Sequence, residues 1–579
     1  MISTLETSER AQLIRETEAI QPGRVNYIFL HALIHATIYE GVSGLRRQQL
    51  HRRATVAIEA IRPDDFESLT AHYLEGGDLE RARKNALKAG ERALGLFANQ
   101  DAEKYFKMNL ELGGTEAEKA MALSGLGQAL SRQSCYIESI DTWKQAIPIY
   151  RQLRNFDQVA RTYACLSEAA RQMGDIEAGI AYGEEGLAQL IEQPATPGKI
   201  ALMRETGYLM SMRGWLEKAI ALFRHALEKA ERIGNIEEQV ETLIHLGYEL
   251  CFSNQTDRSE GFQMLERALT LAESSGLITS AEMAHTYISE FFENEGDMRG
   301  ALDHNEKAIR LSRQIGSTYW ELFNLNWLSF YKFIQGNIKD AELLIERSRY
   351  LAELIGFPGT AVLGFRFREA HMLYARRDTT QTFEMMQKIY RQACQTHNIN
   401  VVVVLTQKMV ECMIIEKMWK EAEEILSETL QIWEQEEEPL LYYFLAIVYS
   451  HQEKLVEAHD MLEKVRVVTG PVIGFWDKFY LAFAEASLAC EEERWDEAWQ
   501  HFDKAYELVA QAGIHWQEAY ILRNRAEALL KRDEAGDKSR AAELLEKTMH
   551  LYQEMQLPEW VHYIENSINK IRENIENQA

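Results

Sequence analysis

Small side chains recur along this chain at a nearly constant step, and this repeat constrains the fold more than any other feature. After a first interval of 20 residues, successive positions are separated by 36 to 43 residues. The positions are Ala82, Ala102, Ser139, Gly179, Ala219, Gly261, Ala301, Ala341, Thr382, Ala422, Ala458, Ala498 and Ala541. A period near 40 over most of 579 residues is typical of a solenoid, in which each repeat packs only on its neighbours.

Each repeat is predicted to be two helices joined by a short turn. In the unit at 201–232, a first helix carries Gly207, the break falls at Gly214, and a second helix places Ala219 and Phe223 at helical spacing. A second series of small residues lies twelve positions before most members of the first: Thr70, Gly90, Gly127, Ser167, Gly207, Ser289, Ser329, Ala370, Ala446 and Ala486. Because two helices approach closely only where the crossing side chains are small, the two series indicate helical hairpins.

This pattern resembles tetratricopeptide repeats (TPRs). The matching residues in the clearest unit are Gly207, Tyr208, Gly214, Ala219, Phe223 and Ala226. The period is longer than the roughly 34 residues of that family, and the proline that usually ends the second helix is mostly absent. The resemblance implies an all-α, right-handed solenoid superhelix of about 12 hairpins. We place the solenoid at residues 66–557 and a C-terminal capping helix at 558–579.

The amino-terminal hundred residues resemble the junction that follows the nucleotide-binding domain of STAND-type ATPases. These include regulators with LuxR-like or maltose-activator architecture and the ATPase-plus-repeat parts of some bacterial cyclases. The likeness is carried by Phe29, His31, Leu33, Ile34, Tyr39, Arg46, Arg47, His51, His72, Tyr73, Gly77, Asp78, Ala82, Ala89, Gly90, Ala93 and Ala98. It implies a small helical, winged-helix-like segment, placed at residues 1–65, before a TPR sensor region. No G-x-x-x-x-G-K-[ST] motif occurs in the sequence, so we expect a chain without the ATPase.

Charge and composition narrow the possible partners. The net charge is −26, although residues 1–62 carry 8 Lys/Arg against 6 Asp/Glu. A body this acidic repels nucleic acid and anionic membranes. The six cysteines are scattered without a CxxC pair, which favours buried thiols over a metal site. The polar first ten residues do not resemble a signal peptide. We therefore expect a cytoplasmic protein without metal, cofactor or membrane contact.

The strongest basic cluster lies near the amino terminus. It consists of Arg46, Arg47, Arg52 and Arg53. Such a cluster either contacts a phosphate backbone or is the solvated face of a helix. The acidity of the remaining chain favours the solvated face.

The first helices of the hairpins are expected to line a concave groove. Side chains beside the small crossing residues then form a stripe of Arg161, Glu168, Arg171, Arg204, Tyr208, Tyr248, Thr286, Glu290, Glu293, Asn326, Phe330, Phe333, Phe367, His371, Tyr374, Gln407, Glu411 and Tyr443. Guanidinium groups suit a carboxylate or an acidic peptide. The aromatic rings either anchor apolar side chains of a partner or belong to the core between repeats.

No spacing typical of a catalytic triad or a Cys/His site occurs, so an enzyme is not expected. The leading hypothesis is a non-enzymatic interaction scaffold or regulatory adaptor, which binds a protein or peptide partner in bacterial signalling or regulation. One alternative is the sensor arm of a STAND-type transcriptional regulator, in which Arg161, Arg204, Tyr208 and Tyr248 contact a small effector. Another is a regulator that contacts DNA through residues 25–62.

Overall fold

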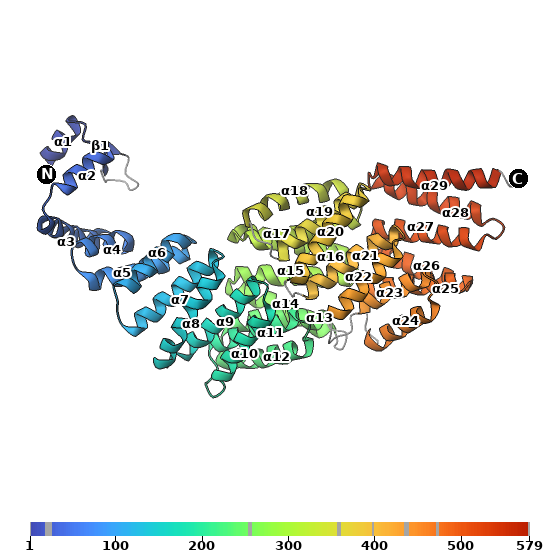
Figure 1. Ribbon diagram of the computed structural model, residues 1–579, viewed down its shortest axis with the longest axis horizontal. Coiled ribbons are helices and arrows are strands. Elements are labelled where there is room, and N and C mark those ends of the chain that lie inside the picture. The colour runs from blue at the N-terminus through green and yellow to red at the C-terminus, as the bar shows by residue number, and fades with distance from the viewer. Residues whose placement is uncertain are drawn as a thin grey trace. The chain divides into compact units, whose positions relative to one another are not determined.

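The computed structural model describes residues 2–17, 26–252, 258–355, 360–395, 399–432, 439–469 and 474–576. Within these ranges the chain is almost wholly helical and forms two compact units, residues 1–162 and 163–579 (Figure 1). None of the described helices combines the length and the apolar character that a bilayer-spanning segment needs.

The first unit begins with α1 (Ile2–Arg10) and an antiparallel hairpin of β1 (Ile14–Thr17) and β2 (Asn26–Phe29), in which Ile14 pairs with Phe29. Its helices are α2 (Ala32–Glu40), α3 (Gly44–Ile61), α4 (Phe66–Glu75), α5 (Leu79–Gly95), α6 (Asn99–Glu111), α7 (Glu116–Arg132) and α8 (Tyr136–Gln152). Helix α9 (Phe156–Gln172) continues from the first unit into the second. The winged-helix-like interpretation of residues 1–65 and the boundaries at 65 and 557 stay predictions.

The second unit contains α10 (Ile176–Gln189), α11 (Pro197–Met212), α12 (Leu216–Ile233), α13 (Ile236–Phe252), α14 (Arg258–Ser275), α15 (Ile278–Asn294), α16 (Met298–Ile315), α17 (Thr318–Ile334), α18 (Ile338–Ile355), α19 (Thr360–Ala375), α20 (Thr379–Gln395), α21 (Ile399–Ile415), α22 (Trp419–Ile432), α23 (Pro439–His451), α24 (Leu455–Thr469), α25 (Phe475–Glu491), α26 (Trp495–Ala512), α27 (His515–Arg532), α28 (Asp537–Glu554) and α29 (Pro558–Glu576). Consecutive helices pack as pairs, from α11 with α12 to α27 with α28. This arrangement confirms an all-α, TPR-like solenoid.

Small residues stand where the paired helices cross. All thirteen members of the first series are buried, and twelve of them are the fourth residue of their helix. In the second series, a Cβ atom added to Gly207 would lie 2.8 Å from the ring of Phe223, and one added to Gly127 would lie 2.5 Å from the indole of Trp143. The missing side chain on the first helix therefore makes room for an aromatic ring of the second. This close approach fixes the geometry of each hairpin.

Short turns join the helices of a pair. Gly214 has a φ of 86°, in the left-handed region that glycine adopts without strain. Several second helices are then capped by an aspartate, as where the Asp297 side chain accepts a hydrogen bond from the Gly300 N–H at 3.0 Å. The turn and the cap together start the second helix at a fixed place after the first.

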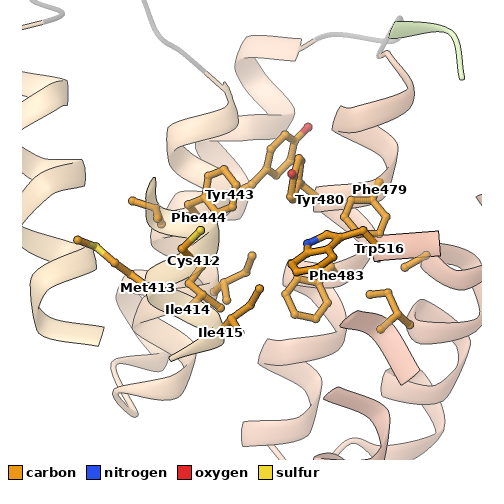
Figure 2. Close-up of a cluster of buried hydrophobic side chains, with 14 of the residues drawn as sticks. Cys412, Met413, Ile414, Ile415, Tyr443, Phe444, Phe479, Tyr480, Phe483 and Trp516 are labelled. Carbon is orange, nitrogen blue, oxygen red and sulfur yellow. The ribbon is translucent and has the colours of Figure 1, made fainter. Parts of the chain in front are cut away.

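Aromatic side chains join helices that are far apart in the sequence. The Trp516 ring of α27 lies 4.8 Å from the Phe333 ring of α17, measured between ring centroids. The Trp476 Nε1 of α25 donates a hydrogen bond to the Glu293 Oε1 of α15 at 2.7 Å, across 183 residues. Figure 2 shows part of this core, where Trp516 lies with rings of α25 and faces side chains of α21. The carboxyl-terminal helices therefore pack against the first helices of earlier pairs.

A charge at a helix crossing tests the register of the hairpins. Ala219 is fully buried at the start of α12, whereas Ala221, two residues later, is exposed. We expect Ala219→Asp to lower the free energy of unfolding by on the order of a few kcal/mol, because the carboxylate would be buried without a partner. Urea unfolding of both variants measures the difference. If Ala219→Asp is no less stable than Ala221→Asp, the register is wrong.

Candidate functional site

A cavity of about 230 Å³ opens among the first helices of the second unit. Its walls come from α9, α11, α13, α15, α17, α19 and α21. The lining residues are Arg171, Tyr208, Ser211, Met212, Tyr248, Glu249, Tyr287, Glu290, Tyr319, Trp320, Phe323, Asn326, Trp327, Gly364, Phe367, Arg368, Val401, Val404 and Leu405. Because first helices of successive pairs share this lining, one ligand there would contact several repeats.

Aromatic rings make up much of the wall. Tyr248 and Tyr287 lie with their ring centroids 4.3 Å apart, and Trp320 lies 5.5 Å from Phe323. Tyr319 and Val404 keep 40% and 44% of their surface exposed although they line the cavity. Exposed apolar surface in a concave site favours a ligand with a flat apolar body.

Glu290 is the acidic group of the cavity with an unused oxygen. The Tyr248 hydroxyl donates a hydrogen bond to its Oε2 at 3.2 Å, whereas its Oε1 has no hydrogen-bond partner among the residues that the structure describes. Burial raises the pKa of this carboxyl to about 8, and the nearby Glu293 adds to the rise. The free protein therefore holds Glu290 mostly protonated at neutral pH. A buried oxygen without a partner is where a donor group of a ligand is expected to bind.

Arg368 is the basic group of the cavity without a carboxylate partner. Its guanidinium lies 4.3 Å from the centroid of the Phe330 ring, and its Nη1 lies 3.4 Å from the His371 Nδ1. No carboxylate oxygen of the described residues lies within 4.0 Å of it, although the side chain is only 9% exposed. Burial lowers the pKa of Arg368 to about 10, so it stays charged at neutral pH.

Six residues of the predicted stripe line this cavity. They are Arg171, Tyr208, Tyr248, Glu290, Asn326 and Phe367. Arg171 already has acidic neighbours, because its Nε donates to the Glu205 Oε1 at 3.3 Å. These six residues, from Arg171 to Phe367, thus contribute to one concave site.

Several other residues of the stripe do not lie on an open surface. Phe330, Phe333, Tyr374 and Tyr443 belong to the hydrophobic core, and His371 is buried 4.7 Å from the Phe367 ring. Glu293 is buried and accepts a hydrogen bond from Trp476. The expectation of one continuous accessible groove needs this correction, because these side chains are buried, and Trp516 packs on Phe333 and Tyr374.

The remaining predicted arginines lie elsewhere. Arg161 pairs with Asp157 at 3.0 Å, and Arg204 lies 3.7 Å from the Glu241 carboxylate. In the basic cluster on α3, the Arg47 guanidinium lies over the Tyr39 ring, and the Arg52 Nε donates to the Gly76 carbonyl at 2.8 Å. Arg46 and Arg53 are exposed. Within the described ranges, no group of three or more His, Cys, Asp or Glu side chains is placed to hold a metal ion.

Arg368 does not belong to the stripe that the sequence predicts. The stripe was projected only from side chains next to the small crossing residues, and it included the neighbouring Phe367 instead. Arg368 stands in the mostly apolar run 361–375, but so does the exposed Arg366, so this run alone does not identify the buried arginine.

The raised pKa of Glu290 predicts a pH dependence of stability. Below the ordinary pKa of 4.5 the carboxyl is protonated in both the folded and the unfolded chain. As pH rises from 4.5 to about 8, only the unfolded carboxyl ionises, so stability is lost over this window. Glu290→Gln removes this loss.

We therefore expect the melting temperature of Glu290→Gln, relative to the unmodified protein, to rise between pH 5 and pH 8. The gain corresponds to a few kcal/mol, at about 1.4 kcal/mol per pKa unit. Glu306→Gln on α16 is the control, because Glu306 is exposed. A Glu290→Gln difference that stays flat across this range would contradict the assigned burial.

Solved structures with a similar fold include three with helical repeats. A STAND protein with a tetratricopeptide repeat sensor from Pyrococcus horikoshii is 14% identical, with 67% of this chain and 58% of that chain covered and a TM-score of 0.38. The Rap conjugation gene regulator of the plasmid pLS20, in complex with the Phr* peptide, is 13% identical, with coverages of 54% and 93% and a TM-score of 0.39. Yeast Tom70 is 13% identical, with coverages of 86% and 97% and a TM-score of 0.32.

Sequence comparison gives one curated relative and one family. An uncharacterized protein of Rhizobium meliloti (strain 1021) is 34% identical over 120 residues, which are 19% of this chain and 12% of that protein. The chain therefore spans only a small part of that relative's length. The model of the family described as "MalT-like TPR region" matches residues 160–465, more than half of the chain and all of the cavity lining. The chain belongs to the MalT-like TPR region family.

Proposed function

We propose that this chain is a non-enzymatic regulatory adaptor that binds a small or short-peptide effector in the cavity of its second unit. The observation that carries the proposal is the lining itself: aromatic walls with a guanidinium that lacks a carboxylate and a carboxyl oxygen that lacks a donor. A buried oxygen without a donor is unfavourable, and a ligand that donates to the Glu290 Oε1 recovers the lost free energy.

The size of the cavity supports an effector over a long protein segment. Ligand pockets typically span about 300–1,000 Å³, and the cavity of about 230 Å³ here lies just below that range. Phe333 and Tyr374, which were expected to anchor a partner, contact Trp516 instead. The chain's own helices thus occupy the inner surface on which a longer segment would lie.

The position of the cavity suggests how binding is relayed. Its lining spans α9 to α21, so a ligand there contacts several repeats at once. A ligand that binds one arrangement of the repeats more tightly shifts the population toward it. In this proposal, the helix faces that point away from the cavity then present a changed surface to a protein partner. The setting that we propose is bacterial regulation of the STAND type, in the cytoplasm.

A cavity-filling substitution tests this function. Gly364 lines the cavity, and a Cβ atom added there would contact only the Asn326 Nδ2, at 3.3 Å. We expect Gly364→Leu to keep the fold, since leucine favours a helix over glycine, and to block ligand entry. The measurement is a thermal-shift screen of the full chain with amino acids, short peptides, oligosaccharides and carboxylic acids.

A ligand of the unmodified protein at about 100 times its Kd should add about 2.7 kcal/mol of stability, and Gly364→Leu should abolish this gain. Gly95→Leu is the control, because nothing lies within 4 Å of the Cβ position of Gly95. The proposal fails if no compound shifts the unmodified protein, or if Gly364→Leu responds as Gly95→Leu does.

A further inference from the structure

We propose that the cavity selects a zwitterion: a free amino acid or short peptide with a large apolar side chain, whose carboxylate binds Arg368 and whose ammonium group binds Glu290. This inference rests on the proposed function and specifies its ligand. Both residues line the same cavity, and each is more than nine-tenths buried. Arg368 carries a positive charge, and Glu290 offers a carboxyl group that becomes negative when it loses its proton.

The carboxylate position follows from the surroundings of Arg368. Arg171, the other arginine of the cavity, has Glu205 at 3.3 Å, whereas Arg368 has no carboxylate within 4.0 Å among the described residues. The guanidinium carbon lies 4.3 Å from the centroid of the Phe330 ring and 5.8 Å from that of Trp327. These rings leave its charge without a carboxylate, and a guanidinium suits a planar, bidentate acceptor such as a carboxylate.

The surrounding acidic groups favour a single negative charge on the ligand. Glu249 and Glu290 line the cavity, and Glu293 is buried close enough to Arg368 to affect its pKa. A phosphate dianion would be repelled by these carboxyl groups more strongly than a carboxylate, particularly away from water. Lys408, the nearby ammonium group, is already paired with Glu411 at 2.9 Å.

The ammonium position follows from the surroundings of Glu290. Its Oε1 lacks a hydrogen-bond partner among the described residues, and the Glu249 carboxyl and several tyrosine rings lie in the same wall. Carboxyl oxygens and ring faces together attract an ammonium group. Glu290 and four other titratable groups influence one another's pKa. These groups are Tyr248 on α13, Tyr287 and Glu293 on α15, and Tyr331 on α17.

Binding of an ammonium group is expected to release a proton. Desolvation keeps the Glu290 carboxyl protonated in the free protein at neutral pH. A cation beside the oxygen favours the ionised form, so the carboxyl loses its proton to solvent as the ligand enters. The ligand then forms an ion pair with a carboxylate that was neutral before binding.

The apolar part of the ligand is expected to lie against the ring-rich wall of α17 and α19. Trp320, Phe323 and Phe367 line this part of the cavity, and Leu405 faces it from α21. These side chains offer no charge and little hydrogen bonding, so a polar side chain on the ligand would lose its hydration there without replacement. Leucine, phenylalanine and tryptophan, free or in a dipeptide, fit this chemistry.

The test is isothermal titration of the full chain at pH 7 with matched probes. L-phenylalanine, L-tryptophan and the dipeptide Leu-Phe carry both charges, phenylalaninamide lacks the carboxylate, and N-acetylphenylalanine lacks the ammonium group. We expect a zwitterion to bind at least tenfold more tightly than either one-sided analogue. Whether the free amino acid or the dipeptide binds more tightly identifies the source of the zwitterion.

Two variants test which side chain binds which charged group of the ligand. Arg368→Gln should abolish the preference for phenylalanine over phenylalaninamide, whereas Arg366→Gln, an exposed arginine on the same helix, should leave it unchanged. Glu290→Gln should abolish the preference over N-acetylphenylalanine. It should also remove the proton release, which is measured by titration in two buffers of different ionisation enthalpy. If a variant does not fold, the analogue series on the unmodified protein still decides the ligand class.

The possible failures are distinguishable. One-sided analogues that bind as tightly as the zwitterion would overturn this inference. Binding of a neutral oligosaccharide or a simple carboxylic acid, with no zwitterion binding, would also overturn it. If Gly364→Leu blocked the binding of that other ligand, the proposed function would still stand. If no probe and no compound of the wider screen binds, both fail.

Discussion

The close crossing of two helices at a small residue is the constraint on which this structure depends. Gly207 accepts the ring of Phe223 at a distance that a larger residue would not allow, and Ala219 is buried at the start of the same second helix. Because the same contact recurs about every 40 residues, each pair of helices has nearly the same geometry. The first helices consequently share one side, and their side chains meet there.

A second kind of contact determines which side chains are buried on the side that the first helices share. Rings from the carboxyl-terminal helices, such as Trp516 and Trp560, pack on Phe333 and Tyr374 of earlier first helices. These contacts bury aromatic surface, which is the main favourable term in folding. Between α9 and α21, first helices of the second unit line the cavity that contains Glu290 and Arg368.

Periodicity explains which features were predictable from the sequence. Local rules that repeat along the chain predict the hairpins and their register. They also predict that Tyr208, Tyr248 and Glu290 lie on the inward side of their helices. The burial of Phe333 under Trp516 does not follow from these rules, because it joins α17 to α27, ten helices later, and leaves no periodic signal in either segment. Arg368 was not predicted because a first helix points more than one row of side chains toward the shared side. The predicted stripe contains only the row beside the small crossing residues.

The most direct measurement is a double-mutant cycle across the contact between Trp476 and Glu293, which joins α25 to α15. It uses Trp476→Phe, Glu293→Gln and the double variant, each unfolded in urea. If the carboxyl-terminal helices close over the earlier ones, the two substitutions are coupled by about 1–3 kcal/mol, as expected for a buried hydrogen bond. Additive effects would mean that the two helices do not touch, and would contradict the account of how the cavity is formed.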